Sequence, residues 1–199
     1  MNKKRRLVHG VGINDAGYFV EKKVMSGGKS KRVWACPFYR KWAHMLQRCY
    51  SKKYQEKSTS YAGCYVVPEW HTFSAFRAWM ITQPWEGNEL DKDILKPGNK
   101  VYSPDTCIFV SSKLNTFMVD RKAGRGDLPL GVTWHKGDRK NQAQCCNPFT
   151  GKYEFLGHFT DPAEAHESWR KRKHELACMH AEMQTDPRIA EALRTRYLA

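Results

Sequence analysis

The chain has 199 residues, with 34 lysines and arginines against 20 aspartates and glutamates, and a formal net charge of +14. A hydrophobic content of 41%, with 13% aromatic residues, excludes a disordered chain, and the length suits one large domain or two small ones. No apolar run approaches the roughly 18 residues of a membrane-spanning helix, and nothing near Met1 resembles a secretory signal. We therefore expect a soluble cytoplasmic protein with no membrane partner, whose charge favours a polyanion such as nucleic acid.

The seven cysteines favour reduced thiols over a disulfide or zinc framework. They include no Cys-x-x-Cys pair, and Cys145 and Cys146 are adjacent in the chain. We expect free thiols, some of them buried in a core. Zinc is therefore not expected as a cofactor, although a zinc site built from scattered cysteines and histidines stays open as an alternative.

Positive charge is concentrated at the start of the chain. Residues 1–32 contain nine lysines or arginines and two acidic residues, Asp15 and Glu21, which is a net charge of +7. The basic runs at 3–6 and 27–32 predict a basic arm and a flexible basic loop. Such segments either follow DNA phosphates or only keep a terminus solvated, and the sequence leaves both roles open for residues 1–32.

Two helices with apolar faces are predicted between residues 33 and 84. From Pro37, apolar side chains recur at i, i+4, i+7, i+8 and i+11, which is the spacing of one helical face. These side chains are Phe38, Trp42, Met45, Leu46 and Cys49. Pro68 opens a second predicted helix, whose apolar face consists of Trp70, Phe73, Phe76 and Met80. Both faces are expected to pack in the core.

Residues 88–119 change to short extended segments followed by a helix. Turn-forming residues separate a candidate strand at 89–95 from an extended segment at 101–102, and residues 108–110 lead into a helix. A helix is predicted over roughly 111–119, and a basic, glycine-rich linker over 121–127. The expected order is therefore strand, loop, strand and helix, followed by a linker.

The last third of the chain predicts three strands and a long helix. The strands are expected at 131–136, 141–146 and 152–159. Asp161, Pro162 and Glu164 form a strong helix start, and this helix is predicted to reach residue 183. A short C-terminal helix is expected within 184–199, and the fold class of the chain is α+β.

The segment from Trp42 to about Phe117 resembles the phage-type HNH endonucleases, the ββα-metal nucleases of mobile and homing elements. The residues that carry the resemblance are, in chain order, Trp42, Met45, Arg48-Cys49-Tyr50, Tyr61-Ala62-Gly63-Cys64, Glu69-Trp70, Phe73, Phe76, Leu90-Asp91-Lys92-Asp93, Tyr102-Ser103-Pro104-Asp105-Thr106-Cys107 and Asn115. The resemblance implies an HNH-like ββα nuclease domain with flanking helices over residues 33–120.

Such a nuclease hydrolyses one phosphodiester bond with a single divalent ion, Mg²⁺ or Mn²⁺, which offsets negative charge in the transition state. Matching positions imply that Asp91 and Asn115 hold the metal ion. Lys92 stands at the position of the general base and Thr106 at that of the middle asparagine, so all four are catalytic candidates. Because one metal centre in one chain cuts one strand, the resemblance implies a nickase.

The motif departs from the family at its base. None of the eight histidines lies between residues 72 and 134, so the histidine base is missing. Two acids, Asp91 and Asp93, flank Lys92, so we interpret Lys92 as a phosphate or leaving-group contact rather than as the base. The departure supports an alternative, a catalytically weakened DNA-binding regulator or inhibitor. A third alternative, an RNA- or ribosome-associated basic protein, lacks an RNA-specific motif.

Residues 128–183 resemble the Apetala/ethylene-response type of DNA-binding domain. The matching residues are Leu130-Gly131-Val132-Thr133-Trp134, Gln142-Ala143-Gln144, Phe155-Leu156-Gly157-His158-Phe159 and Pro162-Ala163-Glu164-Ala165-His166. In that family a three-stranded sheet enters the major groove and a helix packs behind it. The resemblance implies that six exposed side chains contact DNA: Trp134, Lys136, Arg139, Lys140, Gln142 and Gln144. The basic residues 170–173 are expected on a solvated helix face or at a phosphate.

Together the two resemblances imply a phage-encoded, HNH-like DNA endonuclease in the cytoplasm of a bacterial host. Its expected architecture is an HNH-like ββα unit with flanking helices, followed by a three-stranded antiparallel sheet with a helix. Its expected partner is double-stranded DNA, and the sequence identifies no protein partner.

Overall fold

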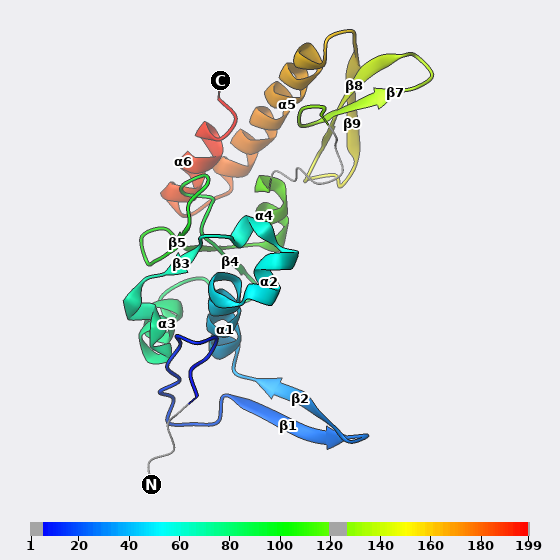
Figure 1. Ribbon diagram of the computed structural model, residues 1–199. Coiled ribbons are helices and arrows are strands. Elements are labelled where there is room, and N and C mark those ends of the chain that lie inside the picture. Colours follow the sequence, from blue (N-terminus) through cyan, green and yellow to red (C-terminus); the bar gives the residue numbers. More distant parts are fainter. Residues whose placement is uncertain (1–5, 120–126, 199) are drawn as a thin grey trace. The chain divides into compact units, whose positions relative to one another are not determined.

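The structure, a computed structural model, describes residues 6–119 and 127–198 (Figure 1). The chain divides into two compact units, Met1–Ser112 and Lys113–Ala199. Both units contain helices and small sheets, so the expected α+β class is confirmed. The predicted basic arm at 3–5 and the linker residues 121–126 lie outside the described residues. Within 6–119 and 127–198, no helix combines the length and the apolar composition needed to cross a bilayer.

The first unit contains, among its described residues, three two-stranded sheets and several short helices. Its strands pair as β1–β2, β3–β5 and β4–β6, of which the second pair is parallel and the others antiparallel. The strands are β1 Glu21–Ser26, β2 Lys29–Ala35, β3 Tyr65–Val66, β4 Glu89–Asp91, β5 Val101–Tyr102 and β6 Ile108–Val110. The helices are α1 Pro37–Tyr50, α2 Lys52–Lys57, α3 Phe73–Ile81 and two 3-10 helices, η1 Thr59–Tyr61 and η2 Pro68–His71.

Aromatic side chains from α1, η2 and α3 form the core of the first unit. Trp42 is fully buried, and its indole Nε1 donates a hydrogen bond of 2.7 Å to the carbonyl of Trp70. Phe73 packs against Trp42 with 5.5 Å between ring centroids, and Phe76 packs edge-on against Trp70. Both predicted apolar faces are buried except for the half-buried Phe38, so their core packing is confirmed. Since burying one such side chain stabilises a fold by about 1.5–3 kcal/mol, this cluster is a major source of the unit's stability.

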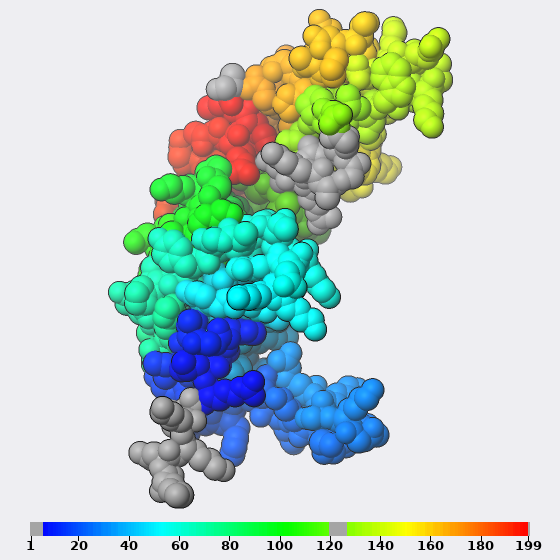
Figure 2. All heavy atoms as spheres, in the orientation of Figure 1, coloured from blue at the N-terminus to red at the C-terminus, as the bar shows by residue number. Residues whose placement is uncertain are grey.

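Residues 21–35 form a β-hairpin, whereas a flexible loop was predicted for 27–32. β1 and β2 are antiparallel, with Ser26 opposite Lys29. Gly27 and Gly28 have φ values of +55° and +73°, the left-handed values that a two-residue hairpin turn of type I′ requires. The prediction was wrong because it weighed the lysines above the Gly-Gly pair, which is a hairpin signal between extended segments. Figure 2 shows this hairpin, in mid-blue, standing out from the rest of its unit.

Two other elements of the first unit are shorter than predicted. The helix expected from Pro68 is split into η2 and α3, because Thr72 between them has extended dihedral angles. The strand expected at 89–95 ends at Asp91, whose side chain accepts hydrogen bonds from the backbone N–H groups of Asp93 and Ile94. This turn, closed by a side chain, replaces the strand ladder and so ends the strand.

The second unit is a three-stranded antiparallel sheet with a helix across one face, as expected (Figure 1). Its strands are β7 Val132–His135, β8 Lys140–Cys146 and β9 Tyr153–Phe159, in the order 7-8-9. Its helices are α5 Pro162–Glu182, α6 Pro187–Thr195 and α4 Ser112–Met118, which begins at the boundary between the units. The predicted N-cap of α5 is confirmed, since the Asp161 carboxylate accepts the N–H of Ala163 at 2.8 Å.

Small residues let α5 lie close to the sheet. Val132, Ala143 and Ala165 form the buried contact between them. Gly131, just before β7, has a φ of +76°, and a Cβ added there would lie 2.0 Å from atoms of the Trp169 ring. Glycine is therefore required at this position both by the backbone conformation and by the close approach of the helix.

Candidate nucleic-acid interface

The face of the sheet turned away from α5 is exposed, and we call it the open face. Side chains alternate along a strand, and the buried Val132 and Ala143 mark the face that α5 covers. The strand residues of the open face are Thr133, His135, Lys140, Gln142, Gln144, Cys146, Tyr153, Phe155 and His158. Tyr153 and Phe155 are 71% and 62% exposed. The open face therefore combines amide, hydroxyl, imidazole, ammonium and aromatic groups.

Three of the six predicted DNA contacts alternate along β8 and share the open face: Lys140, Gln142 and Gln144. Lys136 and Arg139 lie in the exposed turn between β7 and β8. Trp134 is 52% exposed, but it stands opposite the buried Asn141 and so leaves the sheet on the α5 side. Trp134 and the two glutamines therefore lie on opposite faces of the sheet. The DNA-contact role of all six residues stays a prediction.

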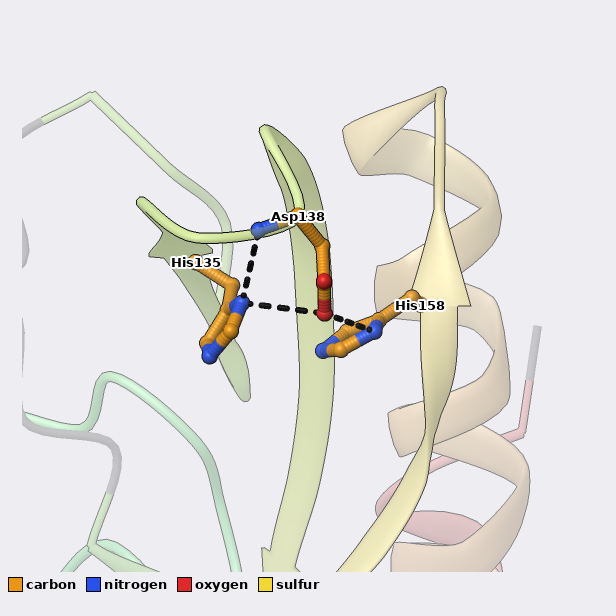
Figure 3. A group of neighbouring side chains, drawn as sticks. All are labelled: His135, Asp138 and His158. Carbon is orange, nitrogen blue, oxygen red and sulfur yellow. Dashed lines mark hydrogen bonds and ion pairs between the residues drawn. The ribbon is translucent and has the colours of Figure 1, made fainter.

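Two histidines and an aspartate meet at one end of the open face (Figure 3). His135 ends β7, Asp138 lies in the following turn, and His158 on β9 stands opposite Gln142 of β8. The Asp138 Oδ2 lies 3.1 Å from the Nδ1 of His135 and 3.0 Å from the Nδ1 of His158. The two imidazole rings are stacked with 4.9 Å between their centroids. This cluster was not predicted from the sequence. Its available signal in the sequence was the placement of His135 and Asp138 at the same turn.

Basic residues of α5 are engaged within the second unit. Arg172 donates hydrogen bonds to the Glu154 carboxylate of β9 at 2.7 and 3.2 Å, and Asn147 donates to the same carboxylate. These hydrogen bonds lower the pKa of Glu154 to about 2. Lys173 donates to the carbonyl of Phe117 and lies 3.6 Å from the centroid of its ring. These two cations therefore hold the helix in place, whereas a solvated or phosphate-contacting role was expected.

Asp91, the predicted strand acid, accepts hydrogen bonds from the loop that follows it. Its Oδ1 accepts the N–H of Asp93 at 2.6 Å and the N–H of Ile94 at 2.8 Å. Burial raises the pKa of the Asp91 carboxyl above its ordinary value, and the two N–H groups oppose this rise. Both bonds go to Oδ1 and leave Oδ2 uninvolved in the turn.

Lys92 and Thr106 meet at the same short segment, residues 99–101. Lys92 is 4% exposed, and its Nζ donates to the Asp93 carboxylate at 2.7 Å and to the carbonyl of Asn99. The Thr106 hydroxyl donates to the carbonyl of Val101 at 2.8 Å, and the Asn99 amide donates to the same carbonyl. These contacts give both residues a structural part in the loop between β4 and β6, and their catalytic roles stay predictions.

Asn115, the second predicted metal ligand, lies on α4 in the second unit. Its Oδ1 is buried, and no donor reaches it among the described residues. Carboxylate and amide oxygens are ligand types that Mg²⁺ and Mn²⁺ accept, so the residue types of Asp91 and Asn115 fit the implied ion. Asp91 belongs to the first unit, and the convergence of the two residues on one ion stays a prediction.

A basic pocket lies beside β4 in the first unit. It has a volume of about 190 Å³ and is lined by Arg40, Lys41, His44 and Arg48 of α1 and by Glu89 and Leu90 of β4. Lys41 pairs with Glu89 at 2.8 Å, which leaves the charges of Arg40 and Arg48 in excess. Burial lowers the pKa of His44, and the surrounding cations, Arg48 foremost, lower it further. The pocket is therefore a site of positive potential that suits an anion such as a phosphate.

Comparisons with known proteins identify no relative of this chain. No family model matches it, and no match is found among curated proteins or among solved structures. Its function must therefore be inferred from the residues of the open face and of the pocket beside β4.

Proposed function

We propose that the protein binds duplex DNA through the open face of its three-stranded sheet. The observation that carries the proposal is the row of Lys140, Gln142 and Gln144 on β8, flanked by the exposed Phe155 of β9. In the major groove a glutamine amide can pair with two atoms of an adenine edge, and a lysine can contact guanine or a phosphate. An aromatic side chain can contact a thymine methyl group. The face thus carries both sequence-reading and charge-neutralising groups.

The width of the sheet supports the same proposal. Neighbouring strands lie about 4.8 Å apart, so β7 and β9 are separated by about 10 Å. The major groove of B-DNA is about 12 Å wide and accepts extended strands. The net charge of +14 adds a salt-dependent attraction to phosphates that does not depend on base sequence.

Selection from a randomised duplex library tests this proposal. The purified protein should enrich a sequence motif, and Gln142→Ala with Gln144→Ala should lose the preference at adenine positions. Each lost pairing costs about 1–3 kcal/mol, so affinity for the selected site should fall at least tenfold. Gln184→Ala, which removes a glutamine beyond the end of α5, is the matched control. Absence of DNA binding, or an unchanged motif and affinity in the double variant, would contradict the proposal.

Metal-dependent nicking of the bound DNA is the second candidate function, and the basic pocket beside β4 favours it. Arg40 and Arg48 offer the pocket's excess charge to a phosphate, and Asp91 follows Leu90 on the strand that forms one wall. Asp91 and Asn115 would hold the Mg²⁺ or Mn²⁺ ion, which when bound offsets charge on the phosphate in the transition state. A DNA-binding regulator without cleavage is the alternative.

Relaxation of supercoiled DNA in Mg²⁺, Mn²⁺ or EDTA distinguishes the nuclease from the regulator. Asp91→Asn removes the charge but keeps an oxygen that can accept the two backbone N–H groups of the turn, so the loop should fold. Asp105→Asn changes an exposed acid in the same region and is the matched control. A nickase should lose metal-dependent nicking in Asp91→Asn and keep it in Asp105→Asn. If the wild-type protein binds DNA but does not nick it with either metal, the regulator is supported.

A further inference from the structure

We propose that His135, Asp138 and His158 bind a transition-metal ion of the Zn²⁺ class. The site uses neither Asp91 nor Asn115, and it does not depend on DNA binding. One nitrogen of each imidazole and one carboxylate oxygen lie within 4.8 Å of one another. Figure 3 shows the Asp138 carboxylate directed between the two histidine rings.

The spacing of the ligand atoms is close to that around one small cation. With metal–ligand bonds of about 2.0 Å, the ligands of a tetrahedral ion are about 3.3 Å apart. The two nitrogen–oxygen separations in the cluster are 3.1 and 3.0 Å. The side chains of His135 and Asp138 are 44% and 52% exposed, so small rotations can bring both nitrogens onto one ion.

The hydrogen bonding of His135 also favours a cation. The backbone N–H of Asp138 donates to the Nδ1 of His135 at 3.2 Å, so this nitrogen offers a lone pair in that contact. The same nitrogen lies 3.1 Å from the Asp138 carboxylate, which has only lone pairs to offer. Since Nδ1 cannot accept from the N–H and donate to the carboxylate at once, one contact is unfavourable in the protein alone. A cation between the nitrogen and the carboxylate turns the second contact into an attraction, with the Nδ1 lone pair directed at the cation in place of the Asp138 N–H.

The ligand set indicates which ion fits. Two imidazoles and one carboxylate suit Zn²⁺, Co²⁺ or Ni²⁺, whereas Mg²⁺ and Ca²⁺ prefer oxygen ligands. Three protein ligands leave one position of a tetrahedral ion open. Because Lys136 and Arg139 belong to the same turn as Asp138, water or a phosphate oxygen can take this fourth position.

Titration with Co²⁺, followed by displacement with Zn²⁺, tests the metal site. We expect one equivalent of Co²⁺ to give visible d–d absorption without the near-ultraviolet charge-transfer band of a cobalt–thiolate bond. His135→Ala should weaken binding at least about 10-fold, since losing even a supporting partner of a metal ligand costs about 10–100-fold. His174→Ala removes a histidine that contacts Cys178 and should leave Co²⁺ binding unchanged.

Asp138→Asn is a second variant, which keeps the shape of the turn and removes the charge of one ligand, and it should also weaken binding. Circular dichroism of each variant verifies that the sheet has folded. No saturable Co²⁺ binding by the wild-type protein, a thiolate band, or wild-type affinity in His135→Ala would overturn the proposal. None of these measurements uses DNA, so they are independent of the proposed function.

The β1–β2 hairpin carries a second inference, which rests on the proposed DNA binding: we infer that one of its faces contacts DNA phosphates. The two faces differ in charge. Lys23 and Arg32 are cross-strand partners, and the Glu21 carboxylate contacts them at 3.2 and 2.8 Å. This face therefore has half of its positive charge offset by an acid that belongs to the hairpin.

The opposite face carries three lysines without an acid. Lys22, Lys29 and Lys31 are exposed, and among the ion pairs of the described residues none involves these three lysines. Lys29 and Lys31 are two residues apart, about 6.8 Å along an extended strand, so their ammonium groups can reach neighbouring phosphates of one DNA strand. Trp34, opposite Lys22, is 50% exposed on the same face. Charge and spacing therefore both suit a DNA backbone.

The salt dependence of duplex binding tests the hairpin face. Lys29→Gln with Lys31→Gln should make the slope of log K against log salt shallower by about 1.8, or about 0.9 for each lost phosphate contact. Lys23→Gln with Arg32→Gln removes the same charge from the other face and should leave the slope unchanged. If the Lys29→Gln, Lys31→Gln variant binds DNA with the same slope as the wild-type protein, this inference alone is overturned. If the wild-type protein does not bind DNA, the proposed function is overturned too. Tighter binding to structured RNA would exclude duplex DNA as the partner.

Discussion

The close approach of Gly131 to Trp169 predicts how much an alanine at position 131 destabilises the second unit. Alanine at position 131 must adopt a φ of +76°, which costs an L-residue about 1–2 kcal/mol. Its Cβ would also lie 2.0 Å from the Trp169 ring, and overpacking of this kind costs about 1–3 kcal/mol. We expect Gly131→Ala to lower the free energy of unfolding of the second unit by about 2–5 kcal/mol. Gly151→Ala is the control, since φ is +70° but nothing lies within 4 Å of the added Cβ.

Hydrogen exchange of β8 and α5 amides across a urea series reports the stability of the second unit by itself. The urea dependence of unfolding is about 1–3 kcal/mol per molar, so a difference of about 2 kcal/mol between the two variants separates their midpoints by about 1 M. The account predicts the lower midpoint for Gly131→Ala. Equal midpoints would refute the close approach of Gly131 to Trp169.

Two further predictions concern Lys92 and Glu154. Lys92→Met leaves the Asn99 carbonyl without its ammonium donor and should lower the free energy of unfolding by about 1–3 kcal/mol. In anisotropy titrations the folded variant should bind DNA as tightly as the wild-type protein. Weaker DNA binding without a loss of stability would contradict the structural role of Lys92. Because Arg172 lowers the pKa of Glu154 to about 2 from an ordinary 4.5, the stabilisation by Glu154 is complete above about pH 4.5 and is lost as the pH falls towards 2. In thermal melts, the stability difference between the wild-type protein and Glu154→Gln should decrease as the pH falls from about 4.5 to 2. A difference that persists at pH 2 would contradict the ion pair.

Elements whose signals are local were predicted correctly. The apolar face of α1 repeats with helical spacing, and the structure buries Trp42, Met45 and Leu46 completely. The start of α5 was predicted from Asp161 and the proline after it, both of which act within one turn. The three strands of the second unit were placed within about one residue of their observed limits, because turns separate them clearly.

Features that depend on side chains meeting across the chain were not predicted. The residues of 89–95 have the composition of a strand, but the Asp91 side chain closes a turn that ends it at residue 91. The cluster of His135, Asp138 and His158 depends on the register that places His158 opposite Gln142. That register is set by the pairing of β8 with β9 and is absent from the spacing of the histidines.

A crosslink from the open face to DNA tests the central claim most directly. Of the seven cysteines, all within the described residues, Cys146 alone is exposed, and it alternates with Gln142 and Gln144 along β8. A thiol-specific photocrosslinker on Cys146, in a Cys178→Ala background, should capture duplex DNA. The control places the same label on the exposed position 171 of α5, through Lys171→Cys in a background that also carries Cys146→Ser. This control protein should not capture duplex DNA. Crosslinking from Cys146 alone is the predicted result, and bound DNA that crosslinks only from position 171, or equally from both positions, would contradict binding through the open face.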